Sequence, residues 1–266
     1  MADAGVTEAV LADLRDEGAE LDGLVGGLDG KGWRLPTPAP RWTVAHQIAH
    51  LLWTDEQALL AATDEPAFRR GLEHAARAPH TFVDEGAERL AALPAHELLA
   101  RWRHGRRELA DVLAHFDGKL PWYGPPMSAV SMATARLMET WAHGEDVAAA
   151  LGVRRAPTVR LRHVARLGVR TRDFAFGVHG LEPPAAPFRV ELTAPDGGLW
   201  TYGPEDAEQR VTGEGADFCR LVTQRLHRAD AHLRAEGPQA EQWLTLAQAF
   251  AGPPGEGRRP AEGDAA

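Results

Sequence analysis

Two carboxylates and an imidazole lie at helical spacing in the segment RLMETWAHGEDVAAALG, residues 136–152. At 100° per residue, His143 lies about 40° from Glu139 around the helix axis, and Asp146 about 20° from it on the other side. Side chains at i and i+4 have Cβ atoms about 6 Å apart, so Glu139 and His143 can reach one metal ion. The same spacing is common for a solvated hydrogen bond, so this pair alone does not define a metal site.

A second histidine becomes relevant if two helices converge. His50 lies in AHQIAHLLWTDEQ, on a helix side that also carries His46, Trp53 and Gln57. On an isolated surface helix this would be the side that faces water. In an antiparallel four-helix bundle, however, this helix and the helix that carries Glu139 can face one interior site.

Two imidazoles and one carboxylate are a ligand set that recurs at catalytic metals. His50, Glu139 and His143 would leave coordination positions open for water or substrate, as in His₂Glu zinc sites and facial-triad iron sites. Structural zinc normally has four protein ligands, often thiolates, and this chain has one cysteine. We therefore predict a divalent-metal site with open coordination positions. The ligand types do not distinguish zinc from another divalent metal. Asp146 is predicted to orient a ligand or to bond elsewhere on its helix.

Composition excludes several classes of protein. The 266 residues carry a net charge of -9, unlike the basic surface of a nucleic-acid-binding protein. No apolar run reaches the roughly 18–20 residues of a membrane helix, so no membrane partner is expected. Cys219 is the only cysteine, and it follows Phe218 at the spacing of packed apolar residues. A chain that forms no internal disulfide suits a reducing compartment, so we expect a cytoplasmic protein.

Helical spacing of apolar residues predicts four long helices in the first half of the chain. Thr43 is placed to cap the second helix at its N-terminus, and Gly152 to follow the last helix as a left-handed residue. A capping box would need Glu or Gln at the position of His46. The expected helices cover residues 5–24, 44–62, 94–116 and 128–150, with short helical pieces within 64–96.

The second half of the chain has a different pattern of apolar and polar residues. Alternating apolar and polar residues flank a Pro-Asp-Gly-Gly turn, which predicts a β-hairpin over 188–203. We therefore predict an α+β protein with a helical domain over 1–152, a smaller α+β domain over 158–252 and a disordered tail over 253–266. Within the second domain the expected elements are helices at 158–177, 215–228 and 240–250 and a strand at 210–213.

The motifs of the first domain resemble a known family. RWTVAHQIAHLLWTDEQAL (41–59) and ETWAHGEDVAAALG (139–152) are similar to the N-terminal domain of mycothiol-dependent maleylpyruvate isomerases, within the DinB/YfiT-like metal-binding superfamily. The resemblance implies a DinB-like four-helix bundle and a divalent metal, commonly zinc, held by His50, Glu139 and His143. At the family's capping position, where an acidic or amide residue is often found, this chain has His46. Because His46 lies one turn before His50, it is predicted to join the metal site or to compete with its ligands. The matching residues are Trp42-Thr43-Val44, Ala49-His50-Leu51 and Glu139 with His143-Gly144-Glu145-Asp146-Val147.

The second domain resembles the small sterol-carrier-like domain that follows the metal domain in these isomerases. The similarity lies in FRVELTAPDGGLWTYGPEDAEQRVTGEGADFCRLVTQRL, and WLTLAQAFAGPPGEGR is similar to an actinobacterial branch of the family. The isomerases use an arginine of this domain near the active site, which implies that Arg225 contacts a substrate carboxylate. A surface arginine without such a role is an equal alternative for Arg225.

The resemblance also implies a chemistry. A low-molecular-weight thiol such as mycothiol would be activated at the metal and would attack an electrophilic small molecule, as an isomerase or an S-transferase does. Two other interpretations stay open at this point: a metal-dependent hydrolase, and a non-catalytic protein that binds a small ligand in a metal-dependent way. No catalytic residue beyond the metal centre is identified from the sequence.

Overall fold

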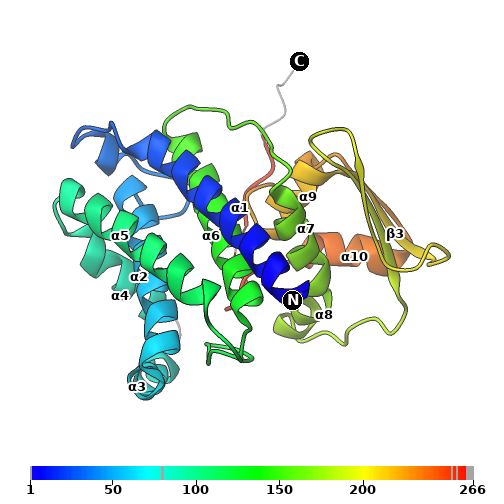
Figure 1. Ribbon diagram of the computed structural model, residues 1–266. Coiled ribbons are helices and arrows are strands. Elements are labelled where there is room, and N and C mark those ends of the chain that lie inside the picture. Colours follow the sequence, from blue (N-terminus) through cyan, green and yellow to red (C-terminus); the bar gives the residue numbers. More distant parts are fainter. Residues whose placement is uncertain (1, 79–80, 253, 256, 262–266) are drawn as a thin grey trace. The chain divides into compact units, whose positions relative to one another are not determined.

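The chain forms two compact units, Met1–Arg155 and Ala156–Ala266, in a computed structural model (Figure 1). The structure describes all residues except 1, 79–80, 253, 256 and 262–266. The predicted disordered tail over 253–266 therefore lies partly outside the described residues. Within the described part of the chain, no helix combines the length and apolarity needed to cross a membrane.

The first unit is a bundle of four long helices with two shorter helices inserted between the second and third. Helix α1 packs along α6 and α5, and α2 packs against α4, α5 and α6. The four helices predicted from apolar spacing are confirmed to within a few residues. The bounds are α1 (Ala2–Val25), α2 (Val44–Thr63), α3 (Glu65–Arg77), α4 (Phe82–Ala91), α5 (Ala95–Ala114) and α6 (Ala129–Ala150), with a 3₁₀ turn η1 (Gly32–Arg34).

Local chemistry fixes the ends of the two helices that matter most for the site. Thr43 precedes α2 in an extended conformation. The backbone N–H of Thr43 donates a hydrogen bond to Nδ1 of His46 at 3.2 Å. His46 thus takes the place of the Glu or Gln of a capping box. After α6, Gly152 has φ +67° and the N–H of Val153 donates to the carbonyl of Ala148 at 2.9 Å. This confirms the predicted glycine stop.

The side of α2 that carries His50 is buried, although on an isolated helix it would face water. Trp53 is 4% exposed and lies under α4, where an added Cβ on Gly86 would come within 2.7 Å of its indole. Because α4, α5 and α6 all pack on α2, this helix is covered on several sides.

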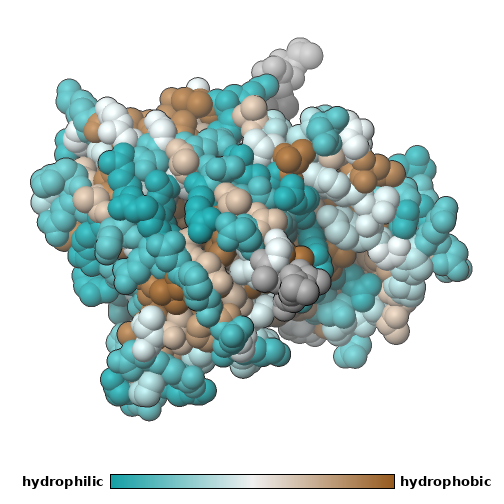
Figure 2. Space-filling model, in the orientation of Figure 1, coloured by the Kyte–Doolittle hydropathy of each residue, from teal (hydrophilic) through white to brown (hydrophobic). Residues whose placement is uncertain are grey.

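The surface of the molecule is mainly hydrophilic, with scattered hydrophobic residues, on the face drawn in Figure 2.

The second unit combines short helices with a four-stranded sheet of order β2-β1-β3-β4. β1 pairs antiparallel with β2 and parallel with β3, and β3 pairs antiparallel with β4. The predicted hairpin is confirmed: Ala194 N–H donates to the carbonyl of Gly198 at 2.8 Å and closes the turn. The strands are β1 (Phe188–Thr193), β2 (Leu199–Tyr202), β3 (Gln209–Glu214) and β4 (Leu233–Glu236).

The three predicted helices of this unit differ in extent from those observed, and the one predicted over 240–250 ends at Leu246. The segment 158–177 is divided at Thr171, which has φ -92° and ψ 10° and lies between the two observed helices. The helix predicted over 215–228 ends at Val222, because Gln224 has φ +60° and Arg225 N–H donates back to the carbonyl of Arg220 at 2.7 Å. The observed helices are α7 (Leu161–Arg170), α8 (Arg172–Val178), α9 (Gly215–Val222), η2 (Arg228–Asp230) and α10 (Pro238–Leu246).

Candidate metal centre

Two histidines and one glutamate meet in the first unit, although His50 and Glu139 are 89 residues apart in the sequence. His50 comes from α2, and Glu139 and His143 come from α6. Oε2 of Glu139 lies 3.4 Å from Nε2 of His50 and 3.1 Å from Nε2 of His143. One potential ligand atom from each of the three residues lies within 4.8 Å of the other two.

These separations fit a single ion. Bonds of about 2.1 Å in a tetrahedral arrangement put two donor atoms about 3.4 Å apart. The donors are two nitrogens and one oxygen, a set that zinc and several other divalent metals accept. Among the described residues, no fourth His, Cys, Asp or Glu joins this group. The donor set therefore fits a metal with coordination positions left for water or another molecule.

The glutamate is ionised and therefore able to act as a ligand. Burial raises the pKa of Glu139, but the hydrogen bonds and positive charge of His143 and His50 outweigh it and hold the pKa well below its usual range. Its side chain remains 21% exposed, whereas the whole residues His50 and His143 are 8% and 7% exposed. The carboxylate thus lies at the more open side of the group.

A chain of hydrogen bonds fixes which nitrogen of His143 carries the proton. The hydroxyl of Thr37 donates to the carbonyl of Trp42 at 2.9 Å, so its oxygen is free to accept from Nε2 of Gln47 at 2.8 Å. The amide oxygen of Gln47 then faces Nδ1 of His143, which must donate to it. Nε2 of His143 is therefore the nitrogen that faces Glu139, and it is the one that could bind a metal once its own proton is released.

An indole covers both imidazoles. The ring centroid of Trp42 lies 5.3 Å from that of His50 and 5.9 Å from that of His143. Its own N–H donates to Oδ1 of Asp84 at 3.2 Å, which holds the ring in place. Nδ1 of His50 has no hydrogen-bond partner among the described residues, so packing between Trp42 and Trp53 is what positions this ring.

Gln47, Thr37 and Trp42 are site residues that the sequence analysis did not single out. Gln47 lies one turn before His50 and is fully buried. A buried amide of this kind needs partners, and that requirement is the signal that could have drawn attention to it. Trp42 is part of the motif quoted above, but nothing in its residue type indicates that it contacts two histidines.

The other predicted site residues lie outside the three-residue group. Asp146 is buried at 1% exposed, one turn beyond His143 on α6, and its orienting role stays a prediction. Both ring nitrogens of His46 have partners, Nδ1 at Thr43 and Nε2 at Glu88, whose Oε2 is 2.8 Å away. The structure therefore does not bring His46 into the group.

Arg225 belongs to the second unit and is half-buried there. Its Nη1 donates to the carbonyl of Thr223 at 2.6 Å. The contact with a substrate carboxylate, implied by the resemblance, stays a prediction.

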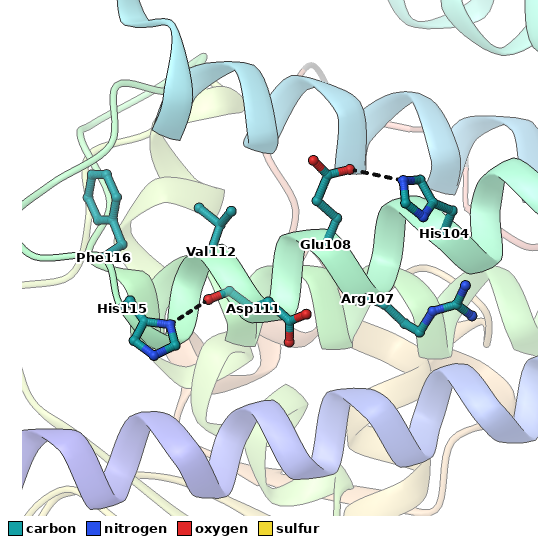
Figure 3. Close-up of a pocket in the computed structure, with 7 residues that line it drawn as sticks. All are labelled: His104, Arg107, Glu108, Asp111, Val112, His115 and Phe116. Atoms are coloured by element: carbon teal, nitrogen blue, oxygen red, sulfur yellow. Dashed lines mark hydrogen bonds and ion pairs between the residues drawn. The ribbon is translucent and has the colours of Figure 1, made fainter.

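A contrasting His–Glu pair lies along α5. His104 and Glu108 are two of the residues that line a broad surface hollow of about 820 Å³. All the residues that line this hollow lie within 104–116 (Figure 3). His104 and Glu108 are 3.5 Å apart at the same four-residue spacing as Glu139 and His143, but their side chains are 74% and 54% exposed. This pair is what the spacing alone would produce on a helix surface, without a second helix to add a ligand.

Comparisons with known proteins agree with this architecture. The family model for the mycothiol maleylpyruvate isomerase N-terminal domain matches residues 14–148. A second family model, described as wyosine base formation, matches residues 184–235 of the second unit. Two Mycobacterium tuberculosis proteins, from strains CDC 1551 and H37Rv and each named an uncharacterized protein, are 58% identical over 260 residues, which is 97% of this chain and 100% of theirs.

Solved structures show the same fold. A crystal structure of the mycothiol-dependent maleylpyruvate isomerase has a TM-score of 0.56 at 18% identity, covering 88% of this chain and 95% of that chain. A histidine-to-alanine mutant of the isomerase has the same TM-score at 17% identity and the same coverage. The fold is thus α+β with a DinB-like helical unit. The chain belongs to the family of proteins that contain the mycothiol maleylpyruvate isomerase N-terminal domain.

Proposed function

We propose that this protein is a divalent-metal-dependent enzyme that activates a low-molecular-weight thiol, such as mycothiol, for attack on an electrophilic small molecule. The observation that carries the proposal is the convergence of two imidazole nitrogens on one carboxylate oxygen, at 3.4 and 3.1 Å. Membership of the mycothiol maleylpyruvate isomerase family supports a thiol as cosubstrate. A cytoplasmic location, where such thiols stay reduced, is part of the proposal.

The residues of the site have distinct tasks in this proposal. His50, Glu139 and His143 would hold the ion, for which zinc is our first choice because it favours nitrogen and carboxylate donors with an open position. A bound dication would lower the pKa of a coordinated thiol from about 8.5 and so favour the thiolate. Gln47 keeps the proton of His143 on Nδ1, and Trp42 shields the two imidazoles from water.

The metal assignment is tested first, by measuring metal content after purification in the presence of zinc. We expect about one ion per chain in the wild type and a large loss in His50→Ala and in Glu139→Ala. The matched controls are His104→Ala and Glu108→Ala, which remove a pair of the same spacing on exposed α5 and should leave the metal content unchanged. If the two site variants retain stoichiometric metal, the proposed ligand set is wrong.

The thiol assignment is tested by titrating mycothiol into metal-loaded and metal-free protein in a calorimeter. We expect saturable binding to the loaded form that is lost without metal or in His143→Ala. Turnover of maleylpyruvate, and of electrophiles that accept a thiol, would then separate an isomerase from a transferase. Hydrolysis of activated esters without any thiol effect would instead favour a hydrolase. Metal and ligand binding without any turnover would favour a binding protein.

A further inference from the structure

A buried ion pair joins the two helices that carry the candidate metal ligands. Nε of Arg136 on α6 donates to Oδ1 of Asp55 on α2 at 2.8 Å. The two side chains are only 3% and 8% exposed. Asp55 lies five residues after His50, and Arg136 lies three residues before Glu139. The pair therefore holds α2 against α6 close to the point where the ligands meet.

The same arginine also contacts the backbone of α2 beside His50. Nη2 of Arg136 donates to the carbonyl of Leu51 at the longer distance of 3.4 Å. At 100° per residue, Leu51 lies about 100° and Asp55 about 140° from His50 around the axis of α2. Arg136 thus holds a side of α2 that differs from the side that carries the ligand. Contacts on two sides fix the rotation of α2 about its own axis, which the contact through His50 alone would leave free.

His50 depends on a fixed backbone more than an ordinary ligand does. Its Nδ1 has no hydrogen-bond partner among the described residues, so no polar contact orients the ring. Packing against Trp42 and Trp53 restricts the ring. The distance from Nε2 of His50 to Oε2 of Glu139, however, is set by the placement of α2 against α6. A metal site needs its ligands held to within about 0.5 Å, so this placement must be specified by other contacts.

Stability alone does not account for the pair. Burial is the largest influence on the pKa of Asp55, and it raises that pKa although the hydrogen bond and charge of Arg136 lower it. The arginine therefore does not fully offset the cost of burying the carboxylate. Buried ion pairs can often be replaced by apolar residues of similar volume without loss of stability, and their best-attested use is to fix the register between helices.

We propose that Arg136 is a positioning residue of the metal centre. Paired with Asp55, it fixes the rotation and register of α2 against α6, and so brings Nε2 of His50 to the carboxylate that shares the ion. Asp55 is not one of the three candidate ligands, so the pair acts through the placement of His50 and not on the ion itself. This inference rests on the metal centre of the proposed function.

The experiment replaces both partners together, as Asp55→Leu with Arg136→Met, because removing one partner would leave a buried charge unpaired. We expect the urea midpoint of the metal-free double variant to equal or exceed that of the wild type. We expect its dissociation constant for Zn²⁺, measured against a chromophoric chelator, to rise about tenfold. The visible absorption of bound Co²⁺, which reports the geometry of the ligands, should also change. A purely structural role would leave the Co²⁺ spectrum as it is.

The matched control is Glu56→Leu with Arg101→Met. Glu56 directly follows Asp55 on α2, but its partner Arg101 donates to it at 2.7 Å from α5, which carries none of the three candidate ligands, and this pair is more exposed. The control should keep the Zn²⁺ affinity and Co²⁺ spectrum of the wild type.

The outcomes separate this inference from the proposed function. A wild type that binds no Zn²⁺ would overturn the metal centre and this inference with it. Zn²⁺ affinity and a Co²⁺ spectrum that are unchanged in the variant with Asp55→Leu and Arg136→Met would overturn the positioning role and leave the metal centre in place. Loss of folding in that variant would also overturn the positioning role, because the pair would then serve stability.

Discussion

Gly144 leaves the space that the guanidinium of Arg155 occupies. A Cβ added to Gly144 would lie 2.7 Å from Nη1 of Arg155. The side chain of Arg155 is only 5% exposed and forms ion pairs with Glu17 and Glu20 of α1. The glycine that directly follows His143 therefore lets an arginine beyond the end of α6 tie α1 to that helix.

Substitution of Gly144 by Ala is expected to destabilise the protein. The added methyl group must displace a buried, ion-paired guanidinium, and such overpacking typically costs about 1–3 kcal/mol. The matched control is Gly23→Ala in α1, where an added Cβ meets nothing within 4 Å, so the better helix propensity of alanine should stabilise by up to about 1 kcal/mol. Urea unfolding of both variants measures the difference. Equal stabilisation by the two substitutions would contradict this account of Gly144.

Gln47→Ala is expected to weaken metal binding without removing a ligand. The variant loses the acceptor that holds Nδ1 of His143, and partners of metal ligands typically contribute 10–100-fold to affinity. Competition with a chromophoric chelator measures the dissociation constant. Gln57→Ala is the control, because Gln57 lies on the same helix but accepts from Tyr123 instead. Equal affinities of the two variants would show that Gln47 does not position His143.

The sequence predicts those features that depend on neighbours along the chain. Glu139 and His143 are one turn apart, so their common direction follows from helical geometry. Gly152 ends α6 because a left-handed residue is needed there. The approach of His50 from another helix follows only from the general arrangement of a four-helix bundle and from the family motif. Helical periodicity alone places His50 on the side of its helix that faces water.

Features that depend on contacts distant in sequence were missed or misjudged. The hydrogen bond from His143 to Gln47 joins residues 96 positions apart, and no local pattern encodes it. Strand β4 has only four residues and gains its pairing from β3, so its own alternation is too short to be recognised. The early end of α9, in contrast, is a local feature that was missed because it depends on a left-handed conformation at Gln224, a residue type for which that conformation is uncommon.

Asp22 gives the protein part of its stability in a pH-dependent way. Its pKa is lowered chiefly by the hydrogen bond from Arg103, with the charges of Arg106 and Arg103 adding to this and burial opposing it. A carboxyl whose pKa is lower in the folded state stabilises above its ordinary value of about 3.9, and this contribution is lost as the pH falls through the folded value. Asp22→Asn should therefore cost about 1 kcal/mol at pH 7, a modest figure because Arg103 is partly exposed.

Urea unfolding at several pH values checks the sign of this effect. The difference between the wild type and Asp22→Asn should shrink steadily as the pH falls from 5 toward 2. Asp111→Asn, an exposed aspartate of α5, should show a small difference at every pH. A cost of Asp22→Asn that is constant or grows in acid would mean that Asp22 is not ionised by its arginine partners.

The donor set predicts which ions stabilise the protein. Two imidazoles and one carboxylate favour Zn²⁺, Co²⁺ and Ni²⁺, whereas Mg²⁺ prefers oxygen ligands and retains its water. A ligand present at 100 times its dissociation constant stabilises the folded state by about 2.7 kcal/mol, so Zn²⁺ should raise the melting temperature of metal-free protein by several degrees. Mg²⁺ at the same concentration should have no effect, and His143→Ala should abolish the response to Zn²⁺. A shift with Mg²⁺ as large as that with Zn²⁺, or a shift that persists in His143→Ala, would place the stabilising ion at other residues than His50, Glu139 and His143.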